Sequence, residues 1–173
     1  VSYPPPTLLF FLPIGWFAKE TAAIVWNASL ALVLLVDIVL MWKLFLRGTG
    51  LLGALFAAAL MLVFHSTTRT FIFTQTSFLL LLFLLLFWRH KTHWAGGVWL
   101  VLAALVKPFV AGLGIYLLLR RQWKLLLSTG AAALVIFGIA FVVFGSETFS
   151  TFLTASPSGR LPDWVYTETT NQG

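Results

Sequence analysis

The chain contains no cysteine and few charged side chains. Of its 173 residues, 9% are charged and 60% are hydrophobic. Without cysteine there is no disulfide, no thiol nucleophile and no cysteine-ligated metal. The mean hydropathy of +0.98 is higher than a soluble domain of this length needs to fill its core. We therefore expect an integral membrane protein.

The excess of basic residues gives a formal net charge of +6, which alone would suit a nucleic-acid partner. The basic residues stand at the ends of apolar runs, however, and this is a topology signal that argues against nucleic-acid binding. Three scattered histidines, His65, His90 and His93, do not indicate a metal site, and no glycine-rich nucleotide loop is present. We expect neither a metal nor another cofactor.

Two apolar runs, residues 95–106 and 109–119, flank Lys107 and Pro108. Each run is shorter than the roughly 20 residues that a spanning helix needs. One helix through both would place a lysine near mid-membrane, at a cost of about 2.5–3.5 kcal/mol. Proline also removes a backbone donor and disfavours helix in the preceding residue. We predict two half-length helices that meet at Lys107-Pro108, with the lysine facing a polar cavity.

The rest of the chain alternates apolar runs with short polar segments, and the predicted fold class is an all-α polytopic membrane bundle. Residues 22–46, 71–88 and 125–144 predict spanning helices, and residues 51–64 predict a shorter one. Tyr3 to Pro6 are expected to be rigid and extended, followed by a short interfacial helix over residues 7–17. We expect a single transmembrane domain over 1–173: an outer loop and interfacial helix over 1–20, transmembrane helices over 21–144 and an outer loop over 145–173.

Alternating these spans divides the charges unequally between the two sides. One side receives seven bases and no acid, and the other receives four of each. The side with seven bases is cytoplasmic by the positive-inside rule. Those bases are Lys43, Arg47, Arg89, Lys91, Arg120, Arg121 and Lys124.

Lys107 and Arg69 are the candidate anion-binding residues on the outer side. Lys107 either snorkels to the interface or is a cation held for a lipid phosphate. Arg69 is either a solvated loop residue or, because guanidinium suits bidentate phosphate binding, a partner for Lys107 on one phosphate. Gln75 either caps a helix or contacts substrate. His65 is either an interfacial hydrogen-bonding residue or a base.

Several motifs occur in a familiar order. An extended Tyr-Pro-Pro leads to a short apolar segment and a long span, and a helix opening with a polar glutamine follows. Ala-Gly, Lys-Pro and Arg-Arg-x-Trp come next. The positions are Tyr3, Pro4, Pro5, Gln75, Ala95, Gly96, Lys107, Pro108, Arg120, Arg121 and Trp123. This order resembles glycosyltransferase family 87, membrane mannosyltransferases of the GT-C class. Asn171 matches that family's Asn-x-Ser region, with Gly173 in place of the serine.

The resemblance implies a GT-C-like glycosyltransferase in the plasma membrane of a prokaryote. It would transfer a hexose, with mannose as the expected sugar, from a polyprenyl-phosphate donor to a lipid or glycan acceptor on the extracytoplasmic side. The family's catalytic aspartate is expected upstream of residue 1, so the catalytic residue is unknown. The resemblance implies donor-phosphate binding by Lys107 and Arg69, and a substrate cavity that includes Tyr3, Gln75, His65 and Asn171.

Two other functions fit the same pattern. A transporter or flippase also uses broken helices around a cation at the membrane midplane. The sequence shows one Lys-Pro break and no counterpart, which favours the transferase. The other possibility is a non-catalytic membrane subunit.

Overall fold

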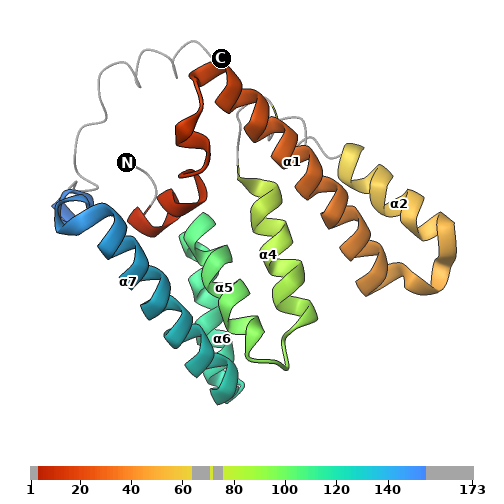
Figure 1. Cartoon of the computed structure of the whole chain (residues 1–173). Helices are drawn as coiled ribbons and strands as arrows, with labels where there is room; N and C mark the ends of the chain where they lie inside the picture. The colour runs from red at the N-terminus through yellow and green to blue at the C-terminus, as the bar shows by residue number, and fades with distance from the viewer. Residues whose placement is uncertain (1–3, 64–70, 72–75, 155–173) are drawn as a thin grey trace, which may run out of the picture.

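The computed structural model describes residues 4–63, 71 and 76–154, and these residues form helices and no strand (Figure 1). Two stretches, Lys19–Val63 and Trp123–Thr154, are long and apolar enough to cross a membrane. Large apolar side chains cover the outside of the bundle; Leu127 and Val142, for example, are 72% and 84% exposed. Lipid can cover such a surface, whereas water would penalise it. The predicted all-α membrane bundle is confirmed.

The first long stretch is a hairpin of two antiparallel helices. Its elements are α1 (Lys19–Met41), a π-helical turn η3 (Trp42–Leu46), a 3-10 turn η4 (Arg47–Thr49) and α2 (Gly50–Val63). Gly50 has φ +59° and ψ −142°, a conformation that glycine adopts without the cost of a Cβ atom. The Trp42 indole N–H donates to the Gly50 carbonyl oxygen at 3.0 Å and so fixes the turn.

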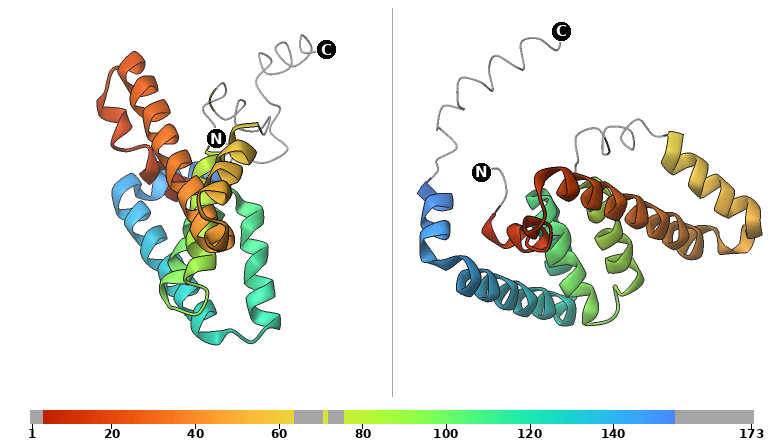
Figure 2. Two further views of the ribbon diagram at one scale, coloured as in Figure 1. Left: turned by 90° about the vertical axis from the view of Figure 1, so that its right-hand side faces the viewer. Right: turned by 45° about the horizontal axis from the view of Figure 1, so that its top comes forward.

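The remaining helices form a row beside this hairpin. They are α4 (Ser77–Arg89), α5 (Ala95–Val106), the 3-10 helix η5 (Pro108–Gly112), α6 (Leu113–Leu119) and α7 (Trp123–Thr154). α5 packs against both α4 and α7, and α4 packs against α1. α2 and α7 therefore lie on opposite sides of the bundle (Figure 2). The main core joins Phe83 of α4, Leu100 and Val106 of α5, and Leu117 of α6.

The predicted break between two half-length helices is confirmed. α5 ends at Val106, and Lys107 is extended, with φ −140° and ψ 106°. The second half differs from the helix expected over residues 109–119, because its first turn is η5 and α-helix begins only at Leu113. Pro108 has no N–H to donate, and Val110 N–H bonds the Lys107 carbonyl oxygen at 3.0 Å in the tighter 3-10 pattern.

The N-terminal segment corrects the sequence prediction. Of the described residues in the proline-rich stretch, only Pro4 is extended, with φ −64° and ψ 149°. The expected interfacial helix is two short 3-10 helices, η1 (Pro5–Phe10) and η2 (Ile14–Trp16). The fixed φ of proline suits the first turn of a helix as well as an extended strand. Pro5, Pro6 and Thr7 are buried, because η1 packs against α5 and α7. This segment is part of the bundle.

Two helix ends also differ from the prediction. α4 begins at Ser77, after a non-helical Thr76, and not at residue 71. Thr76 and Ser77 can bond their own backbone, which favours helix ends over helix interiors. α7 turns at Gly145, where φ is +73°, and continues as helix to Thr154, although we expected an outer loop from residue 145. Glycine permits this conformation, so the turn redirects the helix without ending it.

α5 and α7 approach closely at a glycine pair. A Cβ atom on Gly97 would lie 2.5 Å from the backbone nitrogen of Thr129 and would also collide with the Ser128 hydroxyl. That hydroxyl donates to the Trp94 carbonyl oxygen, which joins the start of α5 to α7. A Cβ atom on Gly96 would lie 2.6 Å from the His90 carbonyl oxygen. Small residues thus set the distance between these two membrane helices.

We expect Gly97→Ala to destabilise the bundle by about 1–3 kcal/mol, because the new methyl group meets backbone that cannot move aside freely. The measurement is the thermal unfolding midpoint of the detergent-solubilised protein. Gly130→Ala is the matched control, since a Cβ atom there has nothing within 4 Å. Equal midpoints for the two variants would show that α5 and α7 do not depend on this contact.

Candidate active site

The helix break at Lys107-Pro108 is stabilised by the N-terminal segment. Thr7 is fully buried, and its Oγ1 donates a hydrogen bond to the Leu105 carbonyl oxygen at 2.9 Å. In an uninterrupted α-helix that carbonyl would accept the N–H of residue 109. Because α5 ends at Val106, the Leu105 carbonyl oxygen accepts its hydrogen bond from the Thr7 hydroxyl instead. The first and second halves of the described chain therefore meet at the break.

An apolar cavity of about 320 Å³ adjoins the break. It extends along α5, α6 and α7, and both Pro4 and Pro108 line it. The other lining residues are Leu100, Val101, Ala104, Leu105, Ala111, Gly114, Thr129, Ala133 and Phe137. Its walls are almost wholly hydrocarbon, and its small residues leave the space open. Such a cavity suits a lipid chain or another elongated apolar group.

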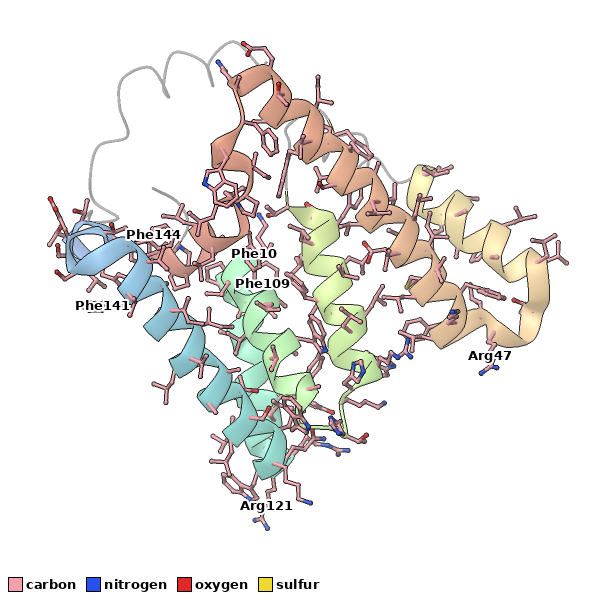
Figure 3. The ribbon with its side chains drawn as sticks, in the orientation of Figure 1. Phe10, Arg47, Phe109, Arg121, Phe141 and Phe144 are labelled. Carbon is pink, nitrogen blue, oxygen red and sulfur yellow. The ribbon has the colours of Figure 1, made fainter. Side chains whose placement is uncertain are left out.

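Lys107 is the one positive charge at this place among the described residues. The side chain is half-buried, and its ammonium group donates no hydrogen bond to any described residue and forms no ion pair with one. Lys107 itself does not line the apolar cavity, but it directly precedes Pro108, which does. An unpaired ammonium at such a helix break can bind an anionic group whose tail is apolar. Phe109, the second residue after Lys107, lies at the end of α5 and α6 that is opposite Arg121 (Figure 3).

The other predicted site residues lie outside the described residues. These are Tyr3, His65, Arg69, Gln75 and Asn171. The structure therefore tests neither their meeting at a common cavity nor a contact between Arg69 and Lys107. Thr7 is a site residue that sequence reasoning missed. The available signal was a lone hydroxyl directly after three prolines and before an apolar run.

Asp37 is the one acid in the span expected over residues 22–46. It is fully buried in α1, and no described residue bonds either carboxyl oxygen. Ionisable side chains inside membrane helices usually have a partner or a function. Asp37 lies one helical turn from the Met41 end of α1, far along the chain from the break.

A polar region lies at the end of the helices that is opposite the break. A cavity of about 530 Å³ opens between the α4–α5 loop and the α6–α7 turn, and Lys91, Arg121 and Lys124 contribute its charges. A neighbouring cavity of about 400 Å³ is lined by Lys43, Arg47 and Arg89 together with Trp42 and Leu44. We call this region the basic end. The bases that sequence analysis assigned to one side thus gather at one end of the bundle.

A family model described as glycosyltransferase family 87 matches residues 2–173. The chain belongs to glycosyltransferase family 87. The family assignment made from the order of the motifs is confirmed.

Curated relatives carry a more specific name. An "Alpha-(1->3)-arabinofuranosyltransferase" of Corynebacterium glutamicum is 33% identical over 158 residues, which are 86% of this chain and 37% of the relative. A protein of the same name from Mycobacterium tuberculosis (strain H37Rv) is 27% identical over 164 residues, or 90% of this chain and 37% of the relative. The chain thus spans 37% of the length of these relatives. No solved structure is significantly similar to it.

The relatives agree with the expected sugar transfer but not with the expected sugar. Their names specify arabinofuranose, a pentose in its five-membered ring form, and we expected a hexose. The motifs quoted from the sequence contain nothing that distinguishes a pentose from a hexose.

We expect Thr7→Val to destabilise the break by about 1–3 kcal/mol, because a buried carbonyl loses its hydrogen-bond donor. Thr7→Ser, which keeps the hydroxyl, should retain most of the stability. The measurement is thermal unfolding in detergent, with cysteine accessibility at an introduced Pro4→Cys as a local probe. If Thr7→Val unfolds at the wild-type temperature, another group satisfies the Leu105 carbonyl.

Proposed function

We propose that this chain is part of an integral membrane glycosyltransferase that uses a polyprenyl-phosphate sugar donor. The observation that carries the proposal is the position of Lys107. This cation has no hydrogen-bond or ion-pair partner among the described residues, and it directly precedes Pro108, which lines an apolar cavity of about 320 Å³. Membership of glycosyltransferase family 87 supports sugar transfer as the reaction.

A polyprenyl-phosphate donor has the chemistry that this site offers to bind. Its isoprenoid chain is apolar and suits the cavity between α5, α6 and α7. Its phosphate is anionic and suits the ammonium group of Lys107, the residue directly before Pro108 in the cavity wall. When the sugar leaves, negative charge develops on the phosphate, and a fixed cation stabilises this charge in a place with little water. No nucleotide site is needed.

The remaining groups of the reaction are assigned by the resemblance. An aspartate elsewhere in the full-length protein would take the proton of the acceptor hydroxyl. Arg69 would share the donor phosphate with Lys107, and Tyr3, Gln75, His65 and Asn171 would line the substrate cavity. The positive-inside rule supports an extracytoplasmic site at the break. The mycobacterial and corynebacterial relatives support a bacterial plasma membrane as the location.

For the sugar we propose arabinofuranose, transferred to a lipid or glycan acceptor. The support comes from the names of the mycobacterial and corynebacterial relatives. Mannose, the sugar expected from the wider family, is the alternative. Both donors are polyprenyl phosphates, so the roles of the cavity and of Lys107 are the same for either sugar.

Lys107→Ala in the full-length protein should lower sugar transfer roughly 100- to 1,000-fold, because the leaving phosphate loses its charge stabilisation. The measurement is transfer in membranes from radiolabelled polyprenyl-phosphate arabinofuranose, with polyprenyl-phosphate mannose in parallel. Lys107→Arg should retain part of the activity, since it keeps the positive charge.

Lys19→Ala is the matched control, because Lys19 is an exposed lysine at the first residue of α1. It should leave transfer unchanged. Equal activity for Lys107→Ala and wild type would remove Lys107 from the mechanism. If the wild type transfers neither sugar but moves labelled lipid across the bilayer, the flippase function replaces the transferase.

Filling the cavity should weaken binding of the donor. Ala133→Phe places a ring in the space between α7 and α5, and we expect the KM for the donor to rise at least about ten-fold. Ala131→Phe is the control, because Ala131 is exposed on α7 and does not line the cavity. A donor with a short, water-soluble prenyl chain should lose less affinity than a long-chain donor. Unchanged KM values would show that the isoprenoid chain binds elsewhere.

A further inference from the structure

The larger cavity at the basic end is built from two separate turns of the chain. The α4–α5 loop contributes Lys91, Thr92 and His93, and the α6–α7 turn contributes Arg121, Gln122, Trp123 and Lys124. The glycine pair of α5 holds the two turns together, since Gly97 lies against Ser128 and Thr129 of α7. The cavity therefore depends on tertiary packing and is more than a cluster along one loop.

The positive charge of this cavity is not neutralised by the described residues. Lys91, Arg121 and Lys124 line it, no acidic residue does, and no ion pair joins these bases to any described carboxylate. The Lys91 Nζ lies 3.9 Å from the centroid of the Trp88 ring, a cation–π contact that keeps the lysine at the rim. Like charges that line one cavity repel one another, and an anion bound among them would relieve this repulsion.

Arg121 occupies a backbone conformation that favours glycine. Its φ is +53°, and it follows the last turn of α6. The N–H groups of Arg121 and Gln122 bond the carbonyl oxygens of Leu118 and Leu117, each at 3.0 Å. This is the hydrogen-bond pattern of a helix C-cap, in which glycine is the usual residue at the left-handed position. An arginine here is strained, and strain of this kind is often retained for function.

Exposed tryptophans around the cavity indicate that it lies at the depth of lipid headgroups. It is at the lower tip of the bundle in Figure 3, where Arg121 is labelled and where α6 ends and α7 begins. Trp88, Trp94 and Trp123 are exposed around it. Exposed tryptophans mark the boundary between hydrocarbon and headgroups in membrane proteins. Basic pockets between membrane helices at this depth bind anionic lipid headgroups.

We infer that this cavity binds the phosphate of an anionic phospholipid from the adjacent leaflet. Lys91 reaches the phosphate from one turn of the chain, and Arg121 and Lys124 reach it from the other. The acyl chains lie in the surrounding bilayer, beside exposed apolar side chains such as Leu127. The site is at the opposite end of the helices from Lys107, so it is independent of the donor site and of the sugar transferred.

The test measures lipid binding to the full-length protein in a neutral detergent. Native mass spectrometry follows titration with phosphatidylglycerol and, separately, with phosphatidylcholine. The wild type should retain phosphatidylglycerol preferentially. Each basic residue removed should lower that affinity about five-fold, so Arg121→Gly with Lys124→Gln should lower it about 25-fold.

Arg121→Gly separates binding from folding. Glycine suits the left-handed position, so this variant should unfold at the wild-type temperature or above it in the absence of lipid, yet bind phosphatidylglycerol more weakly. Arg121→Lys, which keeps the charge, should retain binding. Lys19→Gln removes one positive charge from the first residue of α1, at the end of that helix away from the basic end. This variant should leave the lipid preference unchanged.

Three results would overturn the inference. The first is an unchanged phosphatidylglycerol preference in the double variant. The second is an equal loss in Lys19→Gln, which would mean that net charge alone attracts the lipid. The third is full competition by the same concentration of soluble glycerol phosphate, which would make the cavity a site for free phosphate.

Discussion

Backbone polar groups at membrane depth need hydrogen-bond partners, and this requirement organises the described structure. A proline after Lys107 ends α5 within the apolar layer, so the Leu105 carbonyl oxygen has no helical N–H from which to accept a hydrogen bond. The Thr7 hydroxyl provides the hydrogen bond at 2.9 Å, and it does so from 98 residues away in sequence. To place that hydroxyl, the proline-rich segment must pack between α5 and α7. The cavity beside the break then takes one wall from Pro4 and another from Pro108.

The two ends of the bundle differ in chemistry. In the described part of the chain, the end with the break offers one unpaired ammonium group and an apolar cavity, which suits a ligand with a single anionic head and a long tail. The basic end offers several positive charges and exposed tryptophans, which suits the headgroup layer. Both ends depend on Gly96 and Gly97, which let α5 and α7 pack closely. This close packing shapes the basic cavity and positions the walls of the apolar cavity.

Local features of the sequence were predictable, and long-range contacts were not. The bounds of α5 and the break after it follow from an apolar run that meets a lysine and a proline. The membrane bundle follows from composition, and the family follows from the order of short motifs. The burial of Thr7 depends on α5, and the need for Gly97 depends on Ser128, and neither partner is visible in the local pattern. The turn at Gly145 was missed because a glycine between apolar and polar stretches predicts an end as readily as a bend.

The sequence alone does not determine which of the predicted site residues meet at the break. Gln75 and Arg69 precede α4 in sequence, and their relation to Lys107 depends on packing that no local rule specifies. Asp37 shows the same limit. Its position inside α1 was evident, but whether it has a partner depends on elements outside α1.

The shortness of the central helices has a consequence for how the protein enters the membrane. α5 has 12 residues and is about 18 Å long, against a hydrocarbon layer of about 30 Å. A segment of this length partitions poorly into lipid as it leaves the ribosome. We therefore expect α5, η5 and α6 to remain next to the insertion machinery until α7 is synthesised. They would then enter the bilayer together as a preassembled hairpin. Membrane integration of this region would then be a cooperative event late in translation.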